Sequence, residues 1–172
     1  MKYGRILAFV IAIIIAAADH ITKVMIQHSM SPFDSVPVIP GLLRIVHTEN
    51  PGAAFGVLAE GNPILRSVVL IGVSSVVLCF VLSALWSRGS GYAALPTRFG
   101  LGLILGGALG NLYDRIAHGT VTDFIEVFHG SWSFPAFNVA DSAISIGATL
   151  VLFEMLRSSR KRREVVNVSQ TH

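Results

Sequence analysis

Four long apolar stretches constrain the fold of this 172-residue chain more than any other feature. They cover residues 4–27, 64–86, 97–117 and 138–156. A helix rises about 1.5 Å per residue, so roughly 20 apolar residues cross the hydrocarbon core of a bilayer. The chain is 52% hydrophobic and only 13% charged, which is too apolar for an ordinary soluble domain. We therefore expect an all-α membrane protein whose four transmembrane helices form a single membrane domain over residues 1–172.

The first stretch also resembles a cleavable secretory signal peptide. Lys2 and Arg5 precede an apolar run that ends in small residues at 16–18. Apolar residues resume at 21–26, however, and three further stretches follow. We therefore expect this segment to be retained as a signal anchor that spans the membrane.

The positively charged residues predict which side of the membrane each loop faces. Of the 13 Lys and Arg residues, nine lie near the amino terminus, in the link 87–98 or in the tail 157–172. The four others are Lys23, Arg44, Arg66 and Arg115. By the positive-inside rule, both termini and the basic tail face the cytoplasm, and the loops 28–63 and 118–137 face outward. Because the basic residues concentrate in the tail rather than on a folded face, we expect no nucleic-acid partner.

Both outer loops contain strand-like patterns. Residues 42–48 are apolar and β-branched, and residues 120–128 alternate between two faces as a half-buried strand does. The fold class that we expect is therefore four transmembrane helices with a small extracytoplasmic β-sheet and loop region on the outer side.

With this topology, the unusual polar residues of the apolar stretches lie at one depth, close to the outer leaflet. The set consists of Asp19, Lys23, Asn111, Asp114, Arg115, Asn138 and Asp141. An ionisable group inside a span costs several kcal/mol unless it is paired or hydrated, so each ionisable member of this set is a candidate functional residue.

Several of these residues also have structural interpretations. Asp19 and Lys23 lie four residues apart and can neutralise each other, with Lys23 reaching toward the interface. Asp114 and Arg115 can form a structural ion pair. These two interpretations stay open beside the functional one.

The glycines of the third stretch and the start of the fourth also have structural interpretations. Gly102, Gly106 and Gly110 recur every four residues, which makes a flat stripe that a neighbouring helix can approach closely. Asn138 can be the N-cap of the fourth helix, with Asp141 at the third helical position, where the helix dipole favours a negative charge.

Helix capping leaves Asp123 unexplained. It lies among Val121, Phe124 and Ile125 next to the membrane, an environment that raises the pKa of a carboxyl group. Two nearby carboxylates can then share one proton. With Asp141 as the second carboxylate, such a pair can act as general base and general acid and activate a water molecule to attack an amide.

Other catalytic classes have little support in the sequence. The six histidines are scattered and form no HExxH pattern, so we expect no metalloprotease and no metal site. Cys79 is the single cysteine, which excludes an intrachain disulfide, and we expect it to be buried by packing. Neither a GxSG nor a GxGD motif is present, which argues against serine and presenilin-like intramembrane proteases.

Five short motifs occur in order between about residue 10 and residue 157: DHITK, NPGAAFG, GGALGNLYDR, VTDFI and FNVADS. Each alone is weak, but together and in this order they closely resemble the lipoprotein signal peptidases, or signal peptidase II. The resemblance implies a bacterial inner-membrane aspartic endopeptidase that needs no cofactor. Such an enzyme removes the signal peptide of a prolipoprotein by cutting before the diacylglyceryl-modified cysteine.

The resemblance also assigns roles to individual positions. Asp123 and Asp141 match the catalytic dyad. The positions that match the lining and support of the site are Asp19, Lys23, Asn50, Gly52, Gly107, Asn111, Asp114, Arg115, Asn138 and Ala140. The implied partners are the diacylglyceryl prolipoprotein and membrane lipid, the enzyme is expected to be a monomer, and the glycine stripe would admit the substrate helix.

The competing hypothesis is a small transporter that uses the same ionisable residues as a proton relay. A transporter is expected to place such residues near the middle of the bilayer and to consist of inverted halves. Here they gather toward one side, and the sequence shows no internal repeat.

Overall fold

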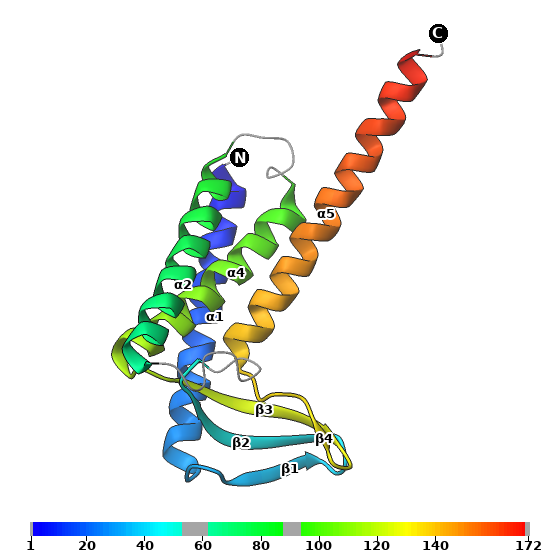
Figure 1. The fold of residues 1–172 in the computed structure, drawn as a ribbon. Coiled ribbons are helices and arrows are strands. Elements are labelled where there is room, and N and C mark those ends of the chain that lie inside the picture. Colours follow the sequence, from blue (N-terminus) through cyan, green and yellow to red (C-terminus); the bar gives the residue numbers. More distant parts are fainter. Residues whose placement is uncertain (1, 53–61, 88–93, 171–172) are drawn as a thin grey trace.

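The computed structural model describes residues 2–52, 62–87 and 94–170 (Figure 1). Within these residues, helices form a bundle and strands form an antiparallel sheet at one end of it. The helices are α1 (Lys2–Ser29), α2 (Pro63–Trp86), α4 (Leu95–Ala117) and α5 (Val139–Gln170). The strands are β1 (Ser35–Ile39), β2 (Leu43–Asn50), β3 (Val121–His129) and β4 (Trp132–Ser133).

Three helices in the described part of the chain are long and apolar enough to cross a membrane. These segments are Tyr3–Ser29 in α1, Ile64–Trp86 in α2 and Val139–Arg160 in α5. Helix α4 is not among them, and it carries glycines as well as the charged residues Arg98, Asp114 and Arg115. The expectation of a helical membrane protein with a small β-sheet is confirmed, whereas the count of four spans stays a prediction.

Glycines let α4 pack directly on the backbone of α1. A Cβ atom on Gly102 would lie 2.7 Å from the carbonyl oxygen of Ala8, and one on Gly106 would lie 2.6 Å from that of Ala12. Only glycine fits such an approach, so the glycine stripe brings a neighbouring helix close, as predicted. Because α1 already fills the stripe, the expectation that it admits a substrate helix is wrong.

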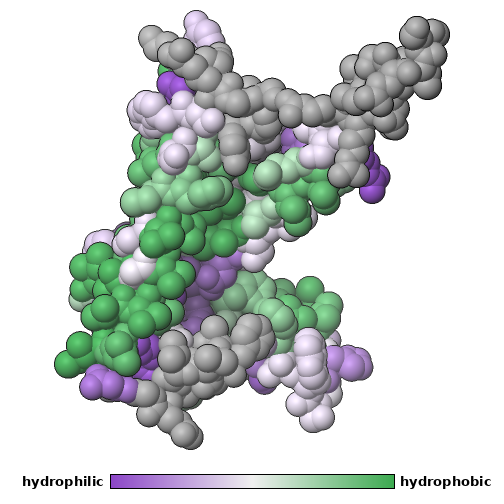
Figure 2. Space-filling model, turned by 45° about the horizontal axis from the view of Figure 1, so that its top comes forward, coloured by the Kyte–Doolittle hydropathy of each residue, from purple (hydrophilic) through white to green (hydrophobic). Residues whose placement is uncertain are grey.

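Large apolar side chains cover the outside of the bundle (Figure 2). Ile13, Val76 and Phe153 are 69%, 69% and 65% exposed, as side chains that face lipid are. Cys79 is exposed on this surface too, so the expectation that it is buried by packing is wrong. Along α2, apolar side chains such as Val68 and Phe80 are exposed, whereas Val81 and Leu85 are buried against neighbouring helices.

The sheet has the strand order β1-β2-β3-β4, with every pair antiparallel. The strand-like segments 42–48 and 120–128 form most of β2 and β3, the two central strands. Their register pairs Asn50 with Val121 and Thr48 with Asp123. This pairing brings the end of β2 next to the carboxylate of Asp123 on β3.

At the other end of the bundle, Arg5 ties α1 to the last turn of α2. Its Nε donates to the carbonyl oxygen of Leu85 at 3.0 Å, and its guanidinium lies 5.4 Å from the ring centroid of Trp86. These contacts satisfy a carbonyl group that the end of a helix leaves without an intrahelical partner.

Candidate active site

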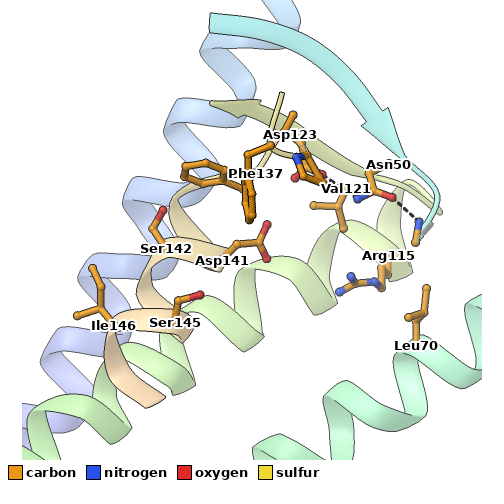
Figure 3. A pocket seen from close by; sticks show the side chains of 14 residues that line it. Asn50, Leu70, Arg115, Val121, Asp123, Phe137, Asp141, Ser142, Ser145 and Ile146 are labelled. Atoms are coloured by element: carbon orange, nitrogen blue, oxygen red, sulfur yellow. Dashed lines mark hydrogen bonds between the residues drawn. The ribbon is translucent and has the colours of Figure 1, made fainter. Parts of the chain in front are cut away.

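A cavity of about 600 Å³ lies where the sheet meets the bundle (Figure 3). Asp123 comes to it from β3, Asp141 from the first turn of α5, and Arg115 from the last turn of α4. Asn50 and Gly52 reach it from the end of β2. The side chains of Asp123 and Asp141 therefore line one space, although they come from different elements.

Asp123 is 2% exposed, and two asparagine amides hold its carboxyl group. Asn50 Nδ2 donates to Oδ2 at 2.8 Å, and Asn138 Nδ2 donates to Oδ1 at 2.7 Å. Burial raises the pKa of Asp123 from 3.8 to about 7, helped by the negative charge of Asp141 and opposed by the two amide hydrogen bonds. Near neutral pH, Asp123 therefore holds its proton more strongly than an ordinary aspartate does.

Asp141 is positioned by the start of α5. Its backbone N–H donates to Asn138 Oδ1 at 2.9 Å, which confirms Asn138 as the N-cap and Asp141 as the third helical residue. Its own Oδ1 accepts a hydrogen bond from Asn111 Nδ2 at 2.7 Å. Asn138 thus contacts both aspartates, one through its amide nitrogen and one through its oxygen.

A buried ion cluster lies behind the cavity. Lys23 is 2% exposed, and its Nζ lies 2.7 Å from Asp19 Oδ2 and 2.6 Å from Asp114 Oδ2. The predicted neutralisation of Asp19 by Lys23 is therefore confirmed. The expectation that Lys23 reaches the interface is wrong, because its ammonium has two carboxylate partners inside the bundle.

The predicted ion pair between Asp114 and Arg115 is also wrong. Adjacent helical residues point in different directions. Asp114 faces Lys23, whereas Arg115 lines the cavity and donates from Nη1 to the carbonyl oxygen of Asn111 at 3.2 Å.

Close backbone contacts hold this region together. A Cβ atom on Gly107 would overlap the carbonyl oxygen of Ala140, so glycine lets α4 meet α5 beside the cavity. The backbone N–H of Ala140 donates to Asp19 Oδ1 at 2.8 Å.

Gly52 has a φ of 99°, which favours glycine, and its N–H donates to Asn50 Oδ1 at 2.8 Å. The rest of the NPGAAFG motif, residues 53–56, lies outside the described residues, as do the side chains of the basic tail from residue 161 onward.

The structure thus brings all the candidate residues into one region, with five lining the cavity and the others behind or beside it. The polar sequence motifs do not indicate the apolar wall of the cavity, which includes Leu70, Phe137 and Ile146. Ser145 also lines it, and its position four residues after Asp141 on the same helix face is the signal that a sequence search could have used. Across the residues that the structure describes, no group of three or more His, Cys, Asp or Glu is arranged to hold a metal ion.

Comparisons with known proteins agree on one family. The sequence model described as "Signal peptidase (SPase) II" matches residues 11–157. The chain is 39% identical over 162 residues to a "Lipoprotein signal peptidase" of Solibacter usitatus, covering 94% of this chain and 96% of the relative. It is 41% identical to one of Geobacter sulfurreducens, covering 84% and 88%.

Solved structures show the same fold. A bacterial membrane enzyme structure at 2.3 Å resolution superposes with a TM-score of 0.77, at 31% sequence identity and with 88% of each chain covered. A second, at 1.9 Å resolution, gives a TM-score of 0.74 at 32% identity and covers 87% of this chain and 92% of the other.

Proposed function

Because this chain belongs to the signal peptidase II family, a family of proteases, we propose that it removes the signal peptides of prolipoproteins. The observation that supports this most is the pair of aspartates, Asp123 and Asp141, on one cavity. The transporter hypothesis has no comparable support, because the charged residues cluster at the sheet end and the family is one of proteases.

The proposed chemistry divides two roles between the aspartates. Near neutral pH, Asp123 retains a proton and acts as the general acid, whereas Asp141 acts as the general base. Asp141 takes a proton from a water molecule, whose oxygen attacks the carbonyl carbon of the scissile bond. Asp123 gives its proton to the carbonyl oxygen, which forms a tetrahedral diol.

Collapse of the diol completes the reaction. Asp141 passes the proton that it took to the leaving nitrogen, the C–N bond breaks, and Asp123 recovers its proton from a diol hydroxyl. The dyad returns to its starting protonation state, so each turnover consumes one water molecule and no cofactor.

Arg115 places a positive charge beside the two aspartates on the cavity wall. Its Nε is buried and has no hydrogen-bond partner in the part of the chain that the structure describes. This N–H is therefore available to bind a peptide carbonyl oxygen and stabilise the charge that develops on it.

The apolar wall of the cavity fits a lipid-modified substrate. Leu70, Phe137 and Ile146 line the same space as the carboxylates. A diacylglyceryl group on the substrate cysteine contributes about 0.8 kcal/mol for each buried methylene, so two acyl chains hold the scissile bond at a fixed depth. We propose that the depth of the dyad, together with this anchoring, selects prolipoproteins.

The proposed topology has four spans, with both termini in the cytoplasm, in a bacterial inner membrane. Asn50 precedes α2 and Val121 follows α4, yet the two residues pair in one sheet. The chain between them must therefore cross the membrane an even number of times. Since α2 is long and apolar enough to cross, α4 supplies the return crossing despite its lower hydropathy.

A cleavage assay with purified protein tests the proposed function. Wild-type protein is expected to cut a diacylglyceryl-modified prolipoprotein before the modified cysteine while a chelator is present. Asp123→Asn and Asp141→Asn are each expected to lose about 100-fold or more in kcat while staying folded. Failure of the wild-type protein to cut would refute the proposed activity, and near-normal kcat in either variant would refute the dyad.

A further inference from the structure

Three asparagine side chains donate hydrogen bonds to the two aspartates. Asn50 and Asn138 donate to Asp123, and Asn111 donates to Asp141, at distances of 2.7 to 2.8 Å. A primary amide has a donor end and an acceptor end. An amide rotated by half a turn would present its oxygen to a carboxylate and repel it, so something must fix the orientation of each amide.

Backbone groups fix two of the three amides. Asn50 Oδ1 accepts from the N–H of Gly52 at 2.8 Å, and Asn138 Oδ1 accepts from the N–H of Asp141 at 2.9 Å. A backbone N–H can only donate, so in both cases the amide oxygen must face it. The amide nitrogen then points toward Asp123, whatever side chains surround it.

Asn111 is oriented by a side chain instead. Its Oδ1 accepts from Lys23 Nζ at 3.0 Å. Asn138 Nδ2 approaches the same oxygen at 3.4 Å, but that nitrogen already donates to Asp123 at the shorter distance of 2.7 Å. An ammonium group has three donors and no acceptor, so only the oxygen of Asn111 can face Lys23.

Lys23 itself has no freedom to turn away. Asp19 and Asp114 accept hydrogen bonds from its ammonium at 2.7 and 2.6 Å, so with Asn111 all three donors have partners. Lys23 does not line the cavity and therefore does not touch a substrate there.

We propose that Lys23 is a positioning residue that acts on the dyad through Asn111, by holding the amide of Asn111 with its N–H toward Asp141. The inference rests on the proposed function. Without the ammonium, the amide is free to turn its oxygen toward Asp141 and repel the carboxylate from the place where it accepts the proton of water. Chemistry then slows, while binding in the cavity changes little.

Lys23→Met tests this role in the cleavage assay with lipidated substrate. We expect kcat to fall by about 10- to 100-fold, the range for loss of a charge-assisted contact that orients a reactive group, with KM within about threefold of wild type. Arg5→Met is the matched control, since it removes a cation from the same helix at the end far from the cavity. It is expected to lower thermal stability and leave kcat unchanged.

A double-mutant cycle distinguishes positioning from general stabilisation. Single-turnover rates are measured for Asn111→Leu, Lys23→Met and the double variant. If Lys23 acts through Asn111, the double variant is as slow as Asn111→Leu alone, within about threefold. If the rate of the double variant fell by the product of the two single-variant effects, the proposal would be overturned. A normal kcat in Lys23→Met would overturn it too.

Lys23→Met leaves two buried carboxylates without their cation, so the variant can fail to fold. Lys23→Met is then measured in the Asp114→Asn background, which removes one of those charges, and is compared with Asp114→Asn alone. A fall in kcat of about 10- to 100-fold relative to Asp114→Asn alone is expected, and no fall would overturn the proposal. Wild-type cleavage is measured in parallel to distinguish failure of the proposed function from failure of the role proposed for Lys23. An inactive wild type would refute the proposed function and not the positioning role.

Discussion

Replacement of Asp123 with asparagine should remove a pH-dependent loss of stability that the wild-type protein carries. The pKa of Asp123 is raised by burial to about 7 from an ordinary value of 3.8. A carboxyl group with a raised pKa stabilises the fold fully below its unfolded pKa. This contribution is lost as pH rises toward the folded pKa, because the unfolded chain has then released the proton that the folded one retains.

The pKa values set the size of the effect. A difference of about 3 pKa units corresponds to about 4 kcal/mol, and the loss accumulates between pH 3.8 and about pH 7. Asp123→Asn has no such titration, so its free energy of unfolding should gain about 4 kcal/mol relative to wild type over this interval. Any constant difference caused by the changed hydrogen bonds to Asn50 and Asn138 cancels in the comparison.

Thermal unfolding followed by tryptophan fluorescence, in one detergent at pH 4, 5.5, 7 and 8, measures the gap between the two proteins. The gap in Tm is expected to widen by about 8 to 16 °C from pH 4 to pH 7 and then to stay constant. Asn62→Ala is the control, because it removes the side-chain cap of α2 without removing a titratable group, and its gap from wild type should be the same at every pH. A constant gap for Asp123→Asn would show that Asp123 does not retain its proton in the folded protein, and its role as general acid would fail.

Three further predictions concern substrate, packing and topology. A prolipoprotein with an unmodified cysteine should be cut far more slowly than the lipidated form in the same detergent, and equal rates would mean that the lipid is not recognised. Gly106→Leu should lower stability by about 1 to 3 kcal/mol or more, because its side chain would meet the backbone of Ala12, whereas Gly72→Leu, with open space around it, should not. Cysteines placed at 160–163 should resist labelling from outside intact cells, whereas one at Ser35 should be labelled, and the reverse pattern would overturn the topology.

Much of the fold and the site could be predicted from local sequence. Long apolar stretches predict helices in a membrane because the bilayer leaves no other partner for buried backbone groups. The alternation at 120–128 predicts the strand that carries Asp123, and the N-cap pattern at Asn138 predicts where α5 begins. These signals are local, since each depends on residues a few positions apart.

Only the tertiary structure decided which groups meet. Residue spacing tells which helix face carries a side chain but not which helix packs against it. Asp114 pairs with Lys23, 91 positions away, rather than with its neighbour Arg115, because packing α4 on α1 puts both charges inside the bundle, where each needs a partner. The same packing of α4 on α1 occupies the glycine stripe. Cys79 is exposed because a bilayer solvates apolar side chains, so they need not be buried inside the protein. The sequence by itself determined which residues are candidates for the proposed chemistry, and the packing of α1, α4 and α5 decided how they are held.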